Sequence, residues 1–174
     1  DFNRFKPLDK KDCQEQLGWN NTKINILFAA NPERLEKNYK LAEEAISIID
    51  DTNILVHFLK GVPNKDMPLY YNATDVVILT SRWEGSPNVI KEAMACNRPI
   101  VATDVGDINE VICDTQGCYI TSFDPIDVSN KLKQAICLGK TNGREDISRL
   151  SSEIIAFKLK QFYIHNKNIS YENH

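Results

Sequence analysis

Short apolar runs alternate with longer segments of helical periodicity along most of the chain. The run at residues 24–30 is brief, apolar and followed by Pro32, which predicts a buried strand that ends in a turn. In residues 38–50, Leu41 and Ala45 recur at helical spacing, which predicts an amphipathic helix. The same pattern predicts strands at 53–59, 75–80, 99–103 and 117–121, and helices at 67–72, 87–96, 107–112 and 124–138.

This alternation of strand and helix predicts an α/β fold. The strand at 75–80 is apolar on both faces, as a central parallel strand requires. We therefore expect a three-layer α/β/α, Rossmann-like domain with a mainly parallel sheet and helices on both faces. Ligands in such sheets bind beyond the carboxyl ends of the strands, where the strand order reverses. The loops that follow the strands are the places to look for chemistry.

The last third of the chain lacks strand patterns. Residues 145–166 predict one long amphipathic helix. Its apolar face would consist of Leu150, Ile154, Phe157, Leu159 and Phe162. Flexible ends are expected before Leu17 and after Asn166. The chain begins with Asp1 and not with Met, which suggests a fragment of a longer protein.

Composition narrows the class of protein. The chain has 174 residues, of which 42% are hydrophobic and 26% charged, enough for one domain with a core. The net charge of -3 and the lack of a basic cluster argue against a nucleic-acid partner. No apolar run approaches the roughly 18 residues of a membrane helix. Five cysteines without ligand spacing are typical of reduced thiols, which predicts a cytoplasmic protein without a metal site.

The segment SRWEGSPNVIKEAMA, at residues 81–95, follows the third predicted strand. Ser86 is expected to be the N-cap of a helix whose first residue is Pro87. The free N–H groups of Asn88 and Val89 would then favour an anion such as a diphosphate.

Two glutamates flank this helix start. Glu84 lies in the loop ahead of the helix, and Glu92 lies about a turn and a half inside it, where it could accept hydrogen bonds from a sugar diol. Taken singly, each is more simply a solvated surface residue. Taken together with the helix start at a strand end, they favour a binding site.

The two glutamates are separated by seven residues, and this E-x7-E spacing resembles the signature of group 1 (family 4) retaining glycosyltransferases. The segments DFNRFKP, LFAANPERLEKNYKLAEEA and 75–112 also resemble the donor-binding half of these GT-B enzymes. The resemblance implies a C-terminal domain whose N-terminal acceptor domain is absent from this chain. It divides the chain into a post-linker segment at 1–16, a Rossmann-like nucleotide-sugar-binding domain at 17–140, and a C-terminal helix and tail at 141–174.

The resemblance also implies roles for individual residues. Glu92 would hold the ribose hydroxyls of the donor. Glu84, the expected catalytic residue, would contact the donor sugar or support the reacting face. The backbone would come close to the sugar and diphosphate at Gly85, Ser86, Pro87, Asn88 and Val89.

A pair of cations normally clamps the diphosphate in this family. Lys37 matches the family lysine at the start of the first long helix. Asn31 stands near the place of the family arginine at the end of the first strand, so Arg34 is the expected replacement. The alternative for Arg34 and Lys37 is a solvated charged loop.

The function implied is transfer of a sugar from a nucleoside-diphosphate sugar to a glycan or lipid-linked acceptor, without a metal or other cofactor. The resemblance further implies a role in polysaccharide biosynthesis, in the cytoplasm or at the cytosolic membrane face. This domain alone is expected to be inactive. A non-catalytic nucleotide-binding or regulatory module of the same fold is the alternative. An epimerase of this architecture would need histidines that the sequence does not place, since His57 lies inside a predicted strand and is expected to pack there.

Overall fold

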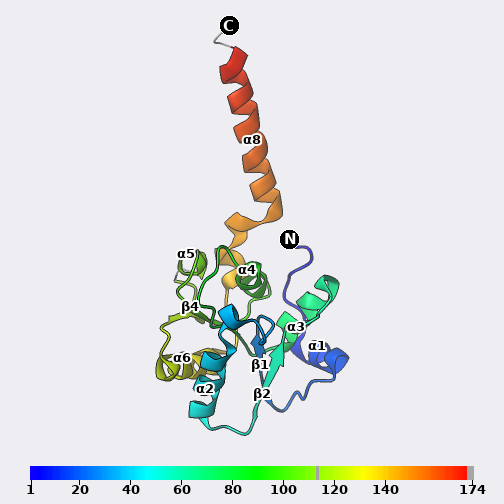
Figure 1. Cartoon of the computed structure of the whole chain (residues 1–174). Coiled ribbons are helices and arrows are strands. Elements are labelled where there is room, and N and C mark those ends of the chain that lie inside the picture. The colour runs from blue at the N-terminus through cyan, green and yellow to red at the C-terminus, as the bar shows by residue number, and fades with distance from the viewer. Residues whose placement is uncertain (113, 172–174) are drawn as a thin grey trace.

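Five short parallel strands form one sheet at the centre of the computed structural model (Figure 1). Their order in the sheet is β2-β1-β3-β4-β5. The structure describes residues 1–112 and 114–171. The strands are β1 (Ile24–Phe28), β2 (Ile54–Phe58), β3 (Val76–Leu79), β4 (Ile100–Thr103) and β5 (Cys118–Thr121). Each lies within a predicted range, and the predicted parallel sheet is confirmed.

Helices cover both faces of this sheet, which confirms the predicted three-layer architecture (Figure 1). The helices are α1 (Lys10–Leu17), α2 (Tyr39–Ile49), α3 (Met67–Ala73), α4 (Asn88–Ala95), α5 (Ile108–Ile112), α6 (Pro125–Leu138), α7 (Gly143–Asp146) and α8 (Ser152–Tyr171). Three short 3-10 helices are η1 (Leu35–Lys37), η2 (Asn64–Asp66) and η3 (Ser148–Leu150).

The core consists of two apolar clusters, one on each face of the sheet. Alternate residues of β1 contribute to different clusters, because successive side chains of a strand point to opposite faces. Ile26 and Phe28 pack against α2 and α6, and Leu27 packs on the side of α3, α4 and α5.

The strand order places a switch point between β1 and β3. The chain leaves β1 through α2 to reach β2 on one side, and then returns through α3 to β3 on the other side of β1. A sheet of this order binds ligands at the carboxyl ends of the two strands that flank the reversal. The loops after β1 and β3 are therefore the structural counterpart of the predicted site.

The prediction of a flexible end before Leu17 is wrong. Residues 10–17 form α1, and Phe5 is buried with its ring edge against Tyr71. Arg144 donates hydrogen bonds to the carbonyl oxygens of Phe5 (2.6 Å) and Phe2 (2.8 Å). A buried aromatic ring and a guanidinium with fixed acceptors hold this segment on the domain, and its polar sequence gave no sign of either.

The predicted helix at 145–166 is instead three pieces, α7, η3 and α8. The break arises because Ile147 turns into the core while Ser151 begins a new direction, its carbonyl oxygen accepting from the N–H of Ile155. The helix α8 then runs to Tyr171 and projects from the body (Figure 1).

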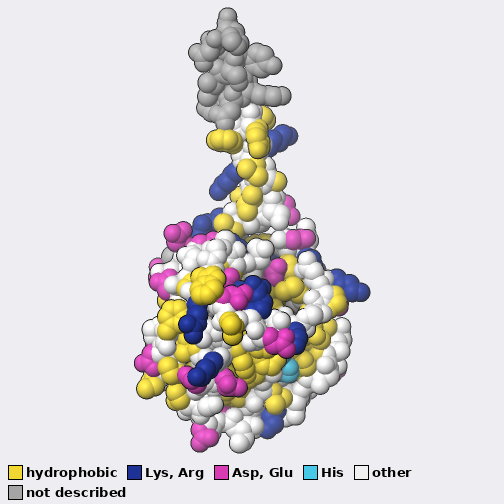
Figure 2. All heavy atoms as spheres, in the orientation of Figure 1, with side chains coloured by type: hydrophobic (Ala, Val, Ile, Leu, Met, Phe, Trp, Pro, Cys, Tyr) yellow, Lys and Arg dark blue, Asp and Glu magenta, His cyan; other side chains and the backbone are white. Residues whose placement is uncertain are grey.

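The predicted apolar face of this last helix is exposed. Figure 2 shows hydrophobic side chains along α8 beyond the globular body. Those more than half exposed are Phe157, Leu159, Phe162 and Tyr163. None of the helices in the described ranges is long and apolar enough to cross a membrane.

Candidate functional site

An ion pair joins the loops that follow β1 and β3. Lys37 ends η1, Glu84 lies in the loop after β3, and the lysine Nζ donates to Glu84 Oε1. Both side chains are largely buried, with 14% of Lys37 and 12% of Glu84 exposed to water. The hydroxyl of Ser81 donates to the same carboxylate oxygen at 2.6 Å. Two predicted site residues thus meet at the switch point.

Hydrogen bonds to backbone carbonyl oxygens fix these loops relative to each other. The N–H of Arg82 donates to the carbonyl oxygen of Glu36 at 2.8 Å. The hydroxyl of Thr80 donates to the carbonyl oxygen of Asn38 at 3.0 Å. Because these bonds cross from one loop to the other, the ion pair forms in a preorganised frame.

The helix α4 begins beside this ion pair, one residue later than predicted. Its N-cap is Pro87, in an extended conformation, and its first residue is Asn88. The prediction that Ser86 caps the helix is wrong, because the Ser86 hydroxyl donates to Asp107 Oδ2 and accepts from Lys91 Nζ. The first N–H groups of α4 still lack intrahelical partners, as at any helix start, and retain the capacity to bind an anion.

The loop after β4 packs closely against the Glu84 loop at Gly106. This glycine has a φ of +62°, and a Cβ added to it would lie 2.1 Å from the carbonyl oxygen of Gly85. The next N–H, of Asp107, donates to that same oxygen at 3.0 Å. Gly106 is therefore required both for its backbone conformation and for the close approach of the two loops.

Glu92 lies in the first turns of α4 and is hydrogen-bonded to a buried tyrosine. The hydroxyl of Tyr71 donates to Glu92 Oε2 at 2.9 Å. Burial raises the pKa of Glu92 above its usual value, and the Tyr71 hydroxyl and the charge of Arg4 oppose that rise. Glu92 lines a cavity of about 280 Å³ together with Asn88 and Lys91.

Arg34 does not join this arrangement. Its Nε donates to Glu36 Oε1 at 2.6 Å, and its side chain is 59% exposed. No hydrogen bond or ion pair connects it to Glu84 or Lys37 in the part of the chain that the structure describes. Its expected role as the second cation of the clamp stays a prediction.

Several contributors to the site were missed from the sequence. Ser81 and Tyr71 each hold one of the two glutamates, and Lys91 bridges α4 to the loop after β4. Tyr71 and Glu92 are 21 residues apart in different helices, so no spacing rule could join them. Ser81 lies three residues before Glu84 in the loop, and a hydroxyl so close to a carboxylate was the one signal available.

His57 packs in the sheet, as predicted. Its ring stacks on Trp19 with 3.4 Å between ring centroids, and its Nε2 lies 2.8 Å from Asn25 Oδ1. Burial lowers the pKa of His57 to about 4.

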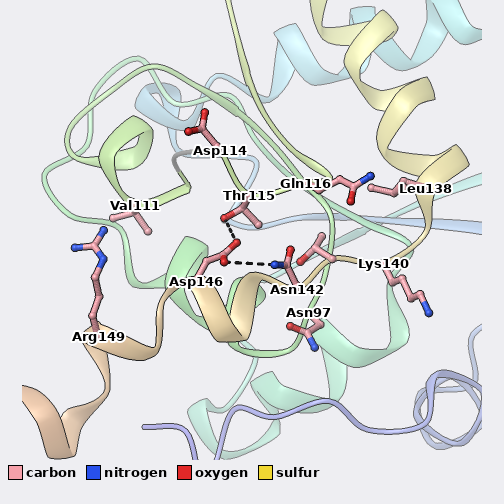
Figure 3. Close-up of a pocket in the computed structure, with 11 residues that line it drawn as sticks. Asn97, Val111, Asp114, Thr115, Gln116, Leu138, Lys140, Asn142, Asp146 and Arg149 are labelled. Atoms are coloured by element: carbon pink, nitrogen blue, oxygen red, sulfur yellow. Dashed lines mark hydrogen bonds between the residues drawn. The ribbon is translucent and has the colours of Figure 1, made fainter.

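A larger cavity, of about 860 Å³, lies at the amino ends of the strands, opposite the switch point (Figure 3). Thr115 and Gln116, which precede β5, line it together with Asn97, which precedes β4. Asp146 accepts hydrogen bonds there from Thr115 (2.7 Å) and Asn142 (3.4 Å). Because this cavity is at the amino ends of the strands, it is away from the switch point where such sheets bind ligands.

Within residues 1–112 and 114–171, no three His, Cys, Asp or Glu side chains lie close enough together to hold an ion.

The sheet order and the flanking helices define a Rossmann-like α/β domain. The family described as "Glycosyl transferases group 1" matches residues 18–137. The chain belongs to this family.

One curated relative is the D-inositol 3-phosphate glycosyltransferase 2 of Catenulispora acidiphila. It is 27% identical over 167 residues, which cover 73% of this chain and 38% of the relative. The chain spans less than two fifths of the length of the curated relatives that it matches along most of its own length.

Solved structures show the same fold. The sucrose-phosphate synthase of Thermosynechococcus elongatus superposes with a TM-score of 0.81 at 20% identity, over 97% of this chain and 51% of that one. The C-terminal domain of a group 1 glycosyl transferase, LpcC of Francisella tularensis, superposes with a TM-score of 0.69 at 18% identity. That match covers 85% of this chain and 96% of the other. The fold is therefore that of one half of a GT-B glycosyltransferase.

Proposed function

We propose that this chain is the nucleotide-sugar-binding domain of a retaining glycosyltransferase. One observation carries the proposal: Lys37 and Glu84 meet at the switch point of the sheet, beside the start of α4. A cation, a carboxylate and free backbone N–H groups are the chemistry that a sugar diphosphate needs. The family membership supports transfer of a sugar as the reaction.

Different residues of the site bind different parts of the nucleotide-sugar donor. The N–H groups of Asn88 and Val89 bind the diphosphate, and Lys37 neutralises the charge that grows on it as the glycosidic bond breaks. The lysine ammonium carries three N–H donors, so it can bind phosphate oxygens without leaving Glu84. Glu84 faces the donor sugar, and Glu92 accepts hydrogen bonds from the ribose diol.

The acceptor is a glycan or a lipid-linked sugar, and it binds mainly to a second domain of a longer protein. The short span of this chain relative to its family relatives supports that arrangement. The reaction takes place in the cytoplasm or at the cytosolic membrane face, in polysaccharide biosynthesis, and without a metal ion. The free thiols of Cys13, Cys96 and Cys118 are in keeping with a reducing compartment.

A non-catalytic nucleotide-binding module is the second candidate. The exposed Arg34, paired with Glu36 and not with the site, is the observation that favours it. Sugar transfer by the longer protein decides between the two. If that protein transfers sugar and Glu92→Gln abolishes the transfer, the domain is catalytic; if Glu92→Gln leaves it unchanged, the donor site is wrong.

Amide chemical-shift mapping of this chain with UDP, GDP and ADP tests where the donor binds. One nucleotide should shift the amide signals of Gly85, Asn88 and Val89. The signals of Thr115 and Gln116, which line the cavity at the amino ends of the strands, serve as the internal control and should not shift. Shifts confined to that second cavity would overturn the assignment.

A further inference from the structure

The hydroxyl of Tyr71 is buried inside the domain, where it can hydrogen-bond only to protein groups that lie beside it. Tyr71 lies in α3, has no exposed surface, and packs its ring against Phe5 with 6.0 Å between centroids. Among the described residues, its hydroxyl hydrogen bond goes to Glu92 Oε2. Because the tyrosine ring is packed in the core, the position of its hydroxyl group is well defined.

Glu92, in contrast, has one side in the protein and one in a cavity. Glu92 lines the cavity of about 280 Å³ beside α4. Asn88 and Lys91 of the same helix also line it, and its other walls are mainly apolar side chains of the N-terminal segment and of residues 147–155, among them Phe2, Phe5 and Leu150. No hydrogen bond to Glu92 Oε1 is found within the described ranges. The hydrogen bond at Oε2 restricts the positions that the carboxylate can take, and its second oxygen keeps its capacity to accept.

We propose that Tyr71 is a positioning residue for Glu92: it holds the carboxylate by Oε2 and leaves Oε1 to accept from the donor's ribose hydroxyls. The inference rests on the proposed function, because it names the residue that orients the diol-binding glutamate. Preorganisation of this kind saves the donor the entropy of fixing a flexible glutamate side chain.

The charge of Glu92 depends on the same hydrogen bond. Burial raises the pKa of Glu92, and the groups that oppose this are the Tyr71 hydroxyl from α3 and the charge of Arg4 from the N-terminal segment. Lys91, on the same helix, lines the same cavity. Loss of the hydroxyl should raise the pKa of Glu92 further, because an O–H donor stabilises the ionised form. Only the ionised carboxylate offers full acceptor capacity to a diol.

Tyr71→Phe removes the hydroxyl and keeps the ring that packs on Phe5. Tyr70→Phe is the matched control, because Tyr70 precedes it in α3, packs its ring against Trp19, and makes no hydroxyl hydrogen bond to a described residue. Thermal unfolding of both variants establishes that each is folded before any binding is measured.

The first measurement is a carbon-13 NMR titration of the glutamate carboxyl groups, with the Glu92 signal assigned by its absence in Glu92→Gln. We expect the pKa of Glu92 to be higher in Tyr71→Phe than in the wild type, and unchanged in Tyr70→Phe. An unchanged pKa in Tyr71→Phe would overturn the inference. This readout needs no ligand, so it is independent of the proposed function.

The second measurement is the affinity for the nucleoside diphosphate that the wild type binds. Tyr71→Phe should lose about tenfold, because the diol then meets a carboxylate that is no longer held in place, and Tyr70→Phe should bind as the wild type does. Equal affinity in the wild type and Tyr71→Phe would overturn the inference. A wild-type chain that binds none of UDP, GDP and ADP would instead contradict the proposed function, and the carboxyl titration would still decide the role of Tyr71.

Discussion

Glu84 is held at one oxygen by two donors from different parts of the chain, the ammonium of Lys37 and the hydroxyl of Ser81. Both partners of the ion pair are largely shielded from water. Removal of one partner of such a pair leaves the other charge without compensation, which costs more than the pair itself contributes. The ion pair should therefore contribute to the stability of the domain.

Lys37→Ala should lower the free energy of unfolding by about 1–3 kcal/mol. The ion pair Lys10–Asp75, at the amino end of β3, is the matched comparison. Its lysine is 40% exposed and so is less buried than Lys37. Lys10→Ala should cost less than about 1 kcal/mol, as exposed pairs do. Urea unfolding of the two variants gives the comparison, and a larger loss in Lys10→Ala would contradict it.

Gly106→Ala should lower the free energy of unfolding by more than the strain of a positive φ alone. The comparison is Gly18→Ala, because Gly18 has a φ of +66° and nothing within 4 Å of an added Cβ. We expect about 1 kcal/mol at Gly18 and about 2–4 kcal/mol at Gly106, where the methyl group meets the backbone of Gly85. Equal losses in urea unfolding would show that the two loops are not packed as described.

His57 should make the fold sensitive to mild acid. Its pKa in the folded chain is about 4, against an ordinary value of 6.5, because the buried ring is disfavoured in its charged form. The folded state thus favours neutral His57, and that stability is complete above pH 6.5 and declines as the pH falls towards 4. His57→Gln should show a smaller decline of the urea midpoint over this interval. An imidazole NMR titration with a midpoint near 6.5 would contradict the prediction.

At the scale of elements, the sequence predicted what depends on local pattern. All five strands and the central helices follow from apolar runs, helical spacing and turn residues, and the E-x7-E pair identified the loop that carries Glu84. The start of α4 was misplaced because Ser86 bonds to Asp107 from a different loop, a tertiary partner that no local capping rule includes.

The two ends of the chain were predicted least well, and for the same reason. Arg144 fixes the N-terminal segment from more than 130 residues away, and Ile147 breaks the last helix by turning into the core. Both are long-range contacts. The Tyr71–Glu92 hydrogen bond is also a contact between residues far apart in the sequence. Sequence motifs do not encode such contacts, so the residues that support the site could not be predicted from them.

Deletion of residues 152–174 should leave the rest of the domain folded. The helix α8 contacts mainly η3 and stands clear of the sheet, so its removal takes little from the core (Figure 1). Its exposed apolar side chains should bind a hydrophobic dye, and that signal should fall in the truncated chain. We expect thermal midpoints within a few degrees of each other. Loss of cooperative unfolding on truncation would show that α8 is part of the core.

For the whole molecule, the candidate site lies at one edge of a single Rossmann-like unit. The chain spans less than two fifths of the length of these family relatives, and the function proposed above assigns the acceptor mainly to a second domain. The chain alone should therefore bind nucleotide weakly and transfer no sugar. Nucleotide release from UDP-sugars and GDP-sugars in the presence of an acceptor provides the assay, and sustained turnover by this chain would contradict the prediction.

We expect the switch point between β1 and β3 to bind a nucleoside diphosphate through Lys37. Calorimetric titration of the chain with UDP, GDP and ADP, repeated on Lys37→Ala and Lys10→Ala, is the decisive measurement. One nucleotide should bind, Lys37→Ala should weaken its binding about tenfold, and Lys10→Ala should leave it unchanged. Equal affinity in the wild type and Lys37→Ala, or no binding of any of the three at millimolar concentration, would contradict this prediction.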